Sequence, residues 1–339
     1  MNARAPRPRR LGLWAPVVLA LAGAGAWSLT WVWMGGETLR RMDAARAALA
    51  GGSWRVSWKS RALSGFPFRL DLDLADARLR GRSGWVLAAP RLEAEAFVFS
   101  PGHWVAVAPE GVTFIRRSGG PVTVKARVLR ASLSDAAARP PRLSIEGEGI
   151  TFTPAPGADP FFVTAAREFH LHTRPGGDDR GAFFVELKQA SVRLSGLMGR
   201  IAGGKPVTLA ADALYSHAGA LAGEDWPSAV RAWTGAGGAL TVRRIEMVAG
   251  EAVLDARAGT LTVGPDGRLR GSLTATLRQA QKALSAMGDA GAIAPEAAGA
   301  AAMVVGARGK GPMATVTLDF QAGRTTLGPA AIGPAPKVY

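Results

Sequence analysis

From Trp54 onward the chain alternates between apolar and polar residues with a period of two, the pattern of β-strands that bury one face. Turn signals such as Gly264-Pro265-Asp266-Gly267 separate the alternating stretches. Strands of this kind are typical of antiparallel sheets. A parallel nucleotide-binding sheet would require strands that alternate with helices, and the sequence does not show that alternation. We therefore expect a mainly β fold, a long curved antiparallel sheet with a few short helices. The clearest alternating stretches are 92–98, 122–128, 269–277 and 314–320.

The stretch Leu63–Leu74 alternates most regularly. Pro67 cannot donate a ladder hydrogen bond, which favours the first position of a strand or an edge. Arg69, Asp71 and Asp73 share one face, and cross-strand ion pairs explain them better than acid–base catalysis. We expect the other face to line an apolar groove or a core between sheets. That face consists of Phe66, Phe68, Leu70, Leu72 and Leu74.

The N-terminus predicts a membrane anchor. Residues 1–10 form a basic tail with four arginines, and residues 11–34 carry no charge. A helix over this uncharged run would be about 36 Å long, enough to cross a hydrocarbon core of about 30 Å. Tryptophans near both of its ends and the arginines before it predict a transmembrane helix with a cytoplasmic N-terminus. The alternative is a cleaved signal peptide, for which Ala24-Gly25-Ala26 offers a small-residue site.

After the anchor we expect a linking helix over 37–52, where apolar residues recur at helical spacing. An exported β-domain follows over 53–327. A weak boundary divides it into halves, 53–195 and 205–327, that need not fold independently. Residues 328–339 contain three prolines and predict a disordered tail.

Helical signals inside the exported domain are few. Asp225 to Trp233 predicts a short helix with Pro227 in its first turn. Leu277 to Met287 predicts another. The alanine- and glycine-rich segment 288–311 fits either a helix or a mobile flap.

Composition limits the classes of function. The chain has 339 residues, of which 48% are hydrophobic, and a net charge of +15. Such a charge favours anionic partners. The arginines are spread along the strands rather than gathered in blocks, and no nucleic-acid-binding module is visible, so we expect no nucleic-acid partner. The absence of cysteine excludes disulfides, thiolate metal sites and cysteine nucleophiles.

The search for catalytic or metal-binding residues predicts none. His170 and His172 alternate with Glu168 on one strand face, a set that fits a polar surface better than a metal site. No phosphate-binding loop or nucleophile elbow occurs, so we expect no cofactor and no enzyme activity. His103 and Trp104 follow a Pro-Gly turn, and we consider them for the mouth of a groove.

Two motifs, "SGFPFRLDL" (64–72) and "SPGHWVAVAPEG" (100–111), resemble the uncharacterised bacterial family of domain of unknown function 2125 over about residues 37 to 325. An anchor precedes the domain in that family, and no activity is established for it. The stretch "LDARAGTLTVGPDGRLRGSLTATL" (254–277) is similar in style to AsmA-type envelope proteins. That similarity implies an inner-membrane anchor and a long sheet folded over an apolar groove that serves lipid transport.

These observations leave two hypotheses. The first is a protein of the bacterial inner membrane with a periplasmic β-domain that holds lipid, or another apolar ligand, in a groove. Its partners would be membrane lipid through residues 11–34 and an anionic lipid or envelope protein elsewhere. The second is a structural or scaffolding envelope protein with a closed core between two sheets.

Overall fold

The computed structural model describes residues 11–52, 54–193, 204–223, 225–250, 252–278, 280–289, 291, 293–310, 313–328 and 330–339. The helices are α1 (Leu11–Ala50), α3 (Trp226–Gly235), α4 (Ala280–Asp289), α5 (Pro295–Arg308) and the short 3-10 helix η1 (Ala218–Ala220). The strands before residue 200 are β1 (Trp54–Ser57), β2 (Ser60–Ser64), β3 (Arg69–Gly81), β4 (Val86–Phe97), β5 (Trp104–Val107), β6 (Val112–Ile115), β7 (Pro121–Lys125), β8 (Val128–Ser134), β9 (Arg142–Pro154), β10 (Val163–Pro175) and β11 (Gly181–Val192). The strands after residue 200 are β12 (Val207–Tyr215), β13 (Leu240–Ala249), β14 (Ala252–Arg257), β15 (Gly259–Val263), β16 (Leu269–Arg278), β17 (Gly309–Lys310), β18 (Met313–Gln321), β19 (Arg324–Leu327) and β20 (Ala330–Pro334).

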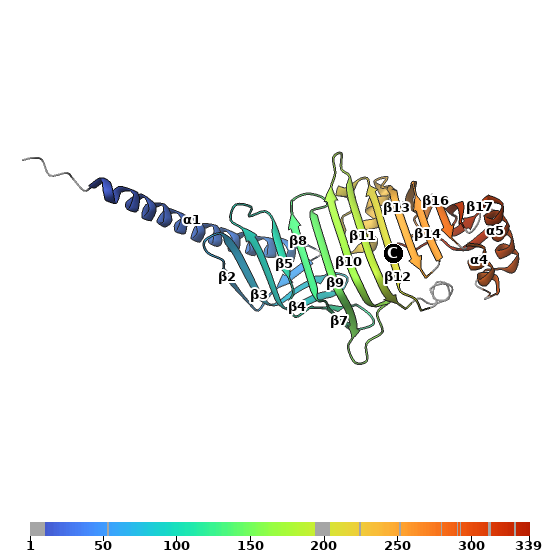
Figure 1. Cartoon of the computed structure of the whole chain (residues 1–339), viewed down its shortest axis with the longest axis horizontal. Coiled ribbons are helices and arrows are strands. Elements are labelled where there is room, and N and C mark those ends of the chain that lie inside the picture. The colour runs from blue at the N-terminus through green and yellow to red at the C-terminus, as the bar shows by residue number, and fades with distance from the viewer. Residues whose placement is uncertain are drawn as a thin grey trace, which may run out of the picture.

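All of these strands belong to one antiparallel sheet. Each strand from β3 to β16 pairs with a strand that precedes it in the chain, so the sheet is a meander. Figure 1 shows it as one long twisted layer, with α1 projecting from one end and α4 and α5 at the other. The prediction of a mainly β fold built on a long antiparallel sheet is confirmed.

Several positions in the sheet are occupied by two short strands placed end to end. β5 and β6 both pair with β4, and β7 and β8 both pair with β9. Gly111 lies in the break between β5 and β6 with a φ of +82°, and a Cβ added there would lie 2.4 Å from the carbonyl oxygen of Val124. Only glycine fits this close approach.

Helix α1 is one continuous helix of 40 residues. Its N-terminal part is long and apolar enough to cross a membrane, and that part is not buried by the rest of the protein. The separate linking helix predicted over 37–52 is therefore the continuation of α1. Glycines at 35 and 36 do not end the helix, because Gly35 is buried against the sheet, where a Cβ would lie 2.8 Å from Leu63 Cδ2.

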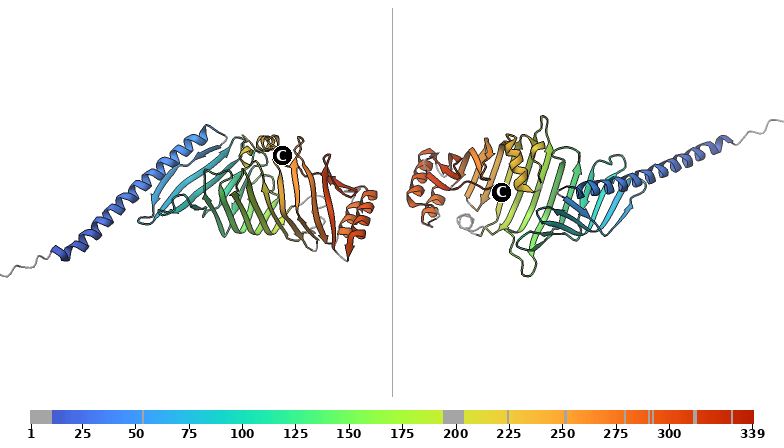
Figure 2. Two further views of the ribbon diagram at one scale, coloured as in Figure 1. Left: turned by 90° about the horizontal axis from the view of Figure 1, so that it is seen from above. Right: turned by 180° about the vertical axis from the view of Figure 1, so that it is seen from behind.

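The helices cover parts of one face of the sheet. Leu39 and Met42 of α1 pack against Leu72 and Leu74 of β3. At the other end, α4 and α5 form the largest buried cluster with strands β13 to β20. Figure 2 shows α1 and α3 on the same side of the layer.

Two further predictions meet the structure here. The alanine-rich segment predicted as a helix or a flap contains helix α5, which packs on β18 and β20. The C-terminal residues predicted as a disordered tail instead form β20, and Val338 N donates to Gly267 O at 2.8 Å. Proline spacing suggested disorder, but this segment has a sheet edge on which to pair. The boundary predicted between 195 and 205 lies mostly outside the described residues, and β11 pairs directly with β12 across it.

Candidate functional site

A single row of apolar side chains crosses the sheet from β2 to β18. Each member is the registered partner of the next, so all lie on the face that the helices partly cover. With strands about 4.8 Å apart, the row is roughly 58 Å long. We call this set the apolar row: Leu63, Leu72, Ala94, Ala106, Ala131, Ile145, Leu171, Val185, Ala211, Ile245, Ala256, Ala275 and Val316.

Burial along the apolar row is uneven. Ala256, Ala275 and Val316 are at most 2% exposed beneath α4 and α5, and Leu72 is buried beside α1. The middle members are only half-buried, and the helices make their main contacts with β1, β15, β18 and β20 instead. We call the middle of the row the open apolar stretch: Ala106, Ala131, Ile145, Leu171, Val185, Ala211 and Ile245. It would be about 29 Å long at the same strand spacing.

A cavity of about 470 Å³ adjoins this stretch, between α3 and the sheet. Leu171 of the apolar row lines it, together with Phe183, Tyr215 and Leu240 from neighbouring strands and Trp233 from α3. Burial raises the pKa of the Tyr215 hydroxyl. The cavity, which we call the α3 cavity, is therefore an apolar space that continues one side of the open apolar stretch.

Helix α3 is fixed over the sheet by its caps and its tryptophans. The Asp225 carboxylate accepts from Ser228 N at 2.8 Å in a capping box, and this hydrogen bonding lowers the pKa of Asp225. Trp233 Nε1 donates to Ser216 O at 2.6 Å, and Trp226 Nε1 donates to Val338 O at 2.9 Å. The helix predicted at residues 225–233 is confirmed with Pro227 in its first turn.

The five residues predicted to share a groove face are split. Leu70, Leu72 and Leu74 lie on β3 and are buried. Phe66 and Phe68 are more than half exposed in the turn before β3, which begins only at Arg69. The apolar alternation continues through the turn, and for that reason the sequence did not reveal where the strand starts.

The two exposed phenylalanines contact helix α1. The Trp31 and Phe66 rings meet edge to face with centroids 5.7 Å apart, and the Trp27 ring lies 6.3 Å from Phe68. Trp27 also stacks on Phe99 of the next turn at 5.6 Å. We call these five residues the aromatic junction, because they join α1 to the tips of the β2–β3 and β4–β5 hairpins.

The residues considered for a groove mouth lie in the loop that follows Phe99. His103 is exposed in this loop. Trp104 begins β5, is half-buried beside the cluster of Leu72 and Leu74, and donates from Nε1 to Pro101 O at 3.0 Å. The loop therefore lies beside the aromatic junction, and Trp104 is two residues from Ala106 at the start of the open apolar stretch.

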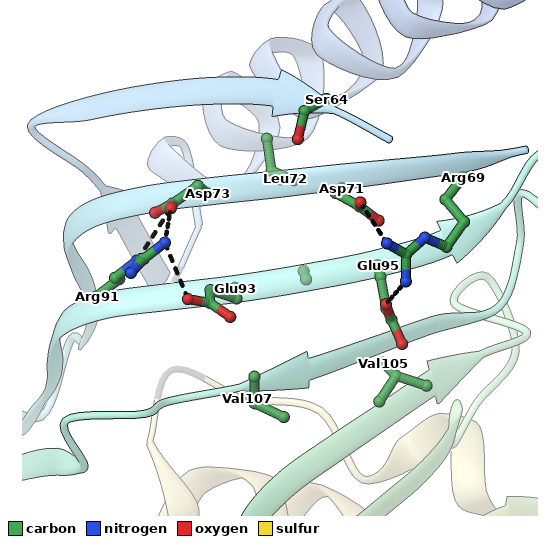
Figure 3. A pocket seen from close by; sticks show the side chains of 11 residues that line it. Ser64, Arg69, Asp71, Leu72, Asp73, Arg91, Glu93, Glu95, Val105 and Val107 are labelled. Carbon is green, nitrogen blue, oxygen red and sulfur yellow. Dashed lines mark hydrogen bonds and ion pairs between the residues drawn. The ribbon is translucent and has the colours of Figure 1, made fainter. Parts of the chain in front are cut away.

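The opposite face of β3 and β4 is charged, as Figure 3 shows. Arg91 Nε donates to Asp73 Oδ2 at 2.9 Å, and this contact raises the pKa of Arg91. Arg69 bridges Asp71 and Glu95, at 3.2 Å from each. A hollow of about 420 Å³ opens over these ion pairs. Arginines neutralise the carboxylates, in agreement with the predicted cross-strand ion pairs.

A cluster that could hold a metal ion lies farther along this polar face. One ligand atom from each of Glu146, His170 and His172 lies within 4.8 Å of the others, a set that suits a divalent transition metal. Arg130 Nε already donates to Glu146 at 2.7 Å and lowers the pKa of that carboxyl, while Ser144 Oγ lies 2.9 Å from His172 Nδ1. His170 Nε2 lies near the Glu168 carboxylate, so all three groups have partners within the sheet, and the prediction of no metal site stays a prediction.

Glu168 belongs to the same face. Lys188 Nζ donates to it at 2.9 Å, and with Arg167 it lowers the pKa of Glu168 to about 2. His170 Nε2 lies 3.6 Å from the same carboxylate. The alternating set of Glu168, His170 and His172 is therefore part of an ion-pair network across strands.

Sequence reasoning missed the open apolar stretch and the second half of the aromatic junction. The alternation in β9 and β11 was a usable signal for Ile145 and Val185. Phe97 is the last residue of β4, and Phe99 follows it after Val98. Two aromatic residues at the end of a strand were a signal for an exposed hairpin tip.

Comparison with known proteins gives one match. No curated protein and no solved structure matches the chain, so the similarity in style to AsmA-type proteins stays a prediction. Residues 31–336 match the family described as uncharacterized protein conserved in bacteria, DUF2125. The matched range includes the end of the apolar helix and nearly all of the sheet. The chain therefore belongs to the DUF2125 family.

Proposed function

We propose that this protein is anchored in the bacterial inner membrane by α1 and binds the acyl chain of a lipid along the open apolar stretch. The observation that carries the proposal is the uneven burial of one continuous row. The same face that is covered at both ends by helices is left half-buried over about 29 Å in the middle. Since two opposed acyl chains fill a bilayer core of roughly 30 Å, one acyl chain would occupy about half of this length.

The energetics favour a ligand of this kind. Each methylene group removed from water contributes about 0.8 kcal/mol, so a chain of a dozen methylenes offers several kcal/mol without any catalytic group. The α3 cavity supplies a partly open apolar space for one end of the chain. We accordingly propose a carrier or holder of lipid in envelope lipid homeostasis or transport rather than an enzyme.

An acidic partner suits the charge of the first strands. Arg55 and Arg80 are registered partners across β1 and β3, although like charges placed directly opposite destabilise a sheet. Arg78 extends the same exposed face, which is the one opposite the apolar row. In the part of the chain that the structure describes, these three arginines have no carboxylate partner, so an acidic envelope protein would complement them.

The orientation follows from the arginines at positions 4, 7, 9 and 10, which precede the span. Positive residues are retained on the cytoplasmic side, so the sheet would lie in the periplasm. This arrangement gives the sheet access to the periplasmic leaflet of the membrane that supplies its ligand.

The scaffolding alternative required a closed core between two sheets. In the described residues three buried clusters join strands with helices and two join neighbouring strands alone, and each stays within one region of a single sheet. A scaffold remains the alternative outcome of the test below.

The test uses the full-length protein in membranes containing phosphatidylglycerol with a photoreactive acyl chain. We expect crosslinks to peptides of β8 to β12, and a several-fold loss of these crosslinks in Ala211→Trp, which fills the open apolar stretch near its β13 end. Ser132→Trp adds the same bulk to the opposite face of β8 and serves as the matched control. Crosslinks confined to α1, or equal crosslinking in both variants, would exclude lipid binding on this face.

A further inference from the structure

Four phenylalanines stand exposed at the tips of the β2–β3 and β4–β5 hairpins. Phe66, Phe68, Phe97 and Phe99 are 55%, 54%, 60% and 72% exposed. The tips are neighbours, because Arg69 is the registered partner of Phe97, and Val98 N donates to Phe68 O at 3.1 Å. Aromatic side chains gathered in this way on one surface mark an interaction site.

The patch is continuous with the membrane helix. Trp27 and Trp31 of α1 contact three of the four phenylalanines through their rings. Their indole N–H groups also donate to the backbone of the first tip, from Trp27 to Pro67 O at 2.9 Å and from Trp31 to Arg69 O at 2.8 Å. The tips are thus held at a defined height along α1.

That height lies within the bilayer. The distance from Trp14 to Trp33 along a helix is about 28 Å, which matches a hydrocarbon core of about 30 Å with one tryptophan at each boundary. Trp27 precedes Trp33 by six residues, so it lies about 9 Å deeper than that boundary. Phe68 and Phe99, which contact Trp27, would reach the outer hydrocarbon, while Phe66 beside Trp31 would lie near the interface.

The backbone of the tips suits this environment, because unpaired polar groups are costly in hydrocarbon. Pro67 has no N–H group, and its carbonyl accepts from Trp27. Arg69 N donates to Gly65 O at 2.8 Å, and Ser100 N donates to Phe97 O at 2.8 Å. The turns therefore satisfy much of their own hydrogen bonding before any lipid is present.

From these observations we infer that the tips of the β2–β3 and β4–β5 hairpins insert into the periplasmic leaflet beside α1. The motif Gly65-Phe66-Pro67-Phe68 is then a second membrane contact that fixes the sheet against the bilayer surface. The inference uses the anchor of the proposed function but not lipid binding on the sheet, so the two can fail separately.

The lack of cysteine in the chain allows a direct test with single-cysteine variants. The full-length protein would carry an environment-sensitive fluorophore at Phe99→Cys, in vesicles of phosphatidylcholine and phosphatidylglycerol. Phe162→Cys is the matched control, because Phe162 is a similarly exposed phenylalanine (62%). It precedes β10, at the opposite ends of the strands from the two hairpin tips. Leu21→Cys, near the middle of the membrane-crossing part of α1, is the control for insertion of the helix.

We expect iodide in the water to quench the label at 99 several-fold less than the label at 162, and doxyl-labelled lipid to quench the labels at 99 and 21. Equal iodide quenching at 99 and 162, with Leu21→Cys in lipid, would overturn the inference and leave the anchor intact. Lipid quenching at 162 as strong as at 99 would also overturn it, because the sheet would then lie flat on the membrane. A water-exposed label at 21 would overturn both the anchor and the inference.

Discussion

The C-terminal end and the middle of the apolar row contain the same kinds of residue in different surroundings. Ala275 and Val316 are buried beneath α4 and α5, whereas Ala131 and Ile145 are half-buried with β-strands as their main neighbours. The pattern along each strand is the same in both regions. The comparison teaches that alternation specifies which face is apolar, but that helices placed elsewhere in the chain decide whether the face becomes core or stays available to a ligand.

The largest expected effect comes from matched truncations in the two regions. Leu327→Ala removes a leucine that is 1% exposed in the C-terminal core and should reduce the free energy of unfolding by about 2–5 kcal/mol. Leu133→Ala, at a leucine 38% exposed on β8, should cost less than about 1 kcal/mol. Urea unfolding of the full chain in nanodiscs measures both values, and similar costs would show that the middle of the face is covered after all.

An intermediate effect is expected where α1 covers the N-terminal end. Gly35→Leu would place side-chain atoms where Leu63 Cδ2 already lies and should reduce the free energy of unfolding by about 1–3 kcal/mol. Gly36→Leu is the control, since a Cβ at position 36 would meet only the end of Arg40 at 3.9 Å. Thermal unfolding of the two variants measures the difference, and equal melting temperatures would mean that α1 does not pack closely against the sheet at Gly35.

The smallest effect concerns the polar face, which the same strands present to solvent. Lys188 and Arg167 lower the pKa of Glu168 to about 2, below the ordinary value of about 4.3. The ionised Glu168 therefore stabilises the fold above about pH 4.3, and this contribution disappears as the pH falls toward 2. Glu168→Gln should be slightly less stable than the wild type at pH 7 and equal to it near pH 2. Urea unfolding across this pH range measures the difference, and a gap that widens at low pH would contradict the assignment.

Local sequence signals predicted much of the fold. Alternation gave the strands, and the Gly-Pro-Asp-Gly turn gave the hairpin of β15 and β16. The predictions failed where contacts distant in sequence decide the outcome. Gly35 lies within the helix, where Leu63 leaves no room for a Cβ atom. Val338 is held by two backbone hydrogen bonds, since its N–H donates to Gly267 and its carbonyl accepts from Trp226.

The candidate site was harder to predict than the fold. Leu70, Leu72 and Leu74 were correctly placed on one strand face, but α1 and the neighbouring strands bury that part of the face. Ile145 and Val185 alternate just as regularly and are left half-buried. Periodicity within a strand contains no information about which distant helix covers it, so the open region could be located only from the three-dimensional structure.

The meander has a consequence for biosynthesis. Because each strand from β3 to β16 pairs with one made shortly before it, the sheet can assemble in the order of translation, starting from α1. Contacts between residues close in sequence cost little loop entropy and form rapidly. At every stage the newest strand is an unpaired edge that only the next strand covers, and α4, α5 and β18 to β20 close the growing end last. In a chain that emerges from its N-terminus, each strand from β3 to β16 therefore finds a pairing strand that has already been made.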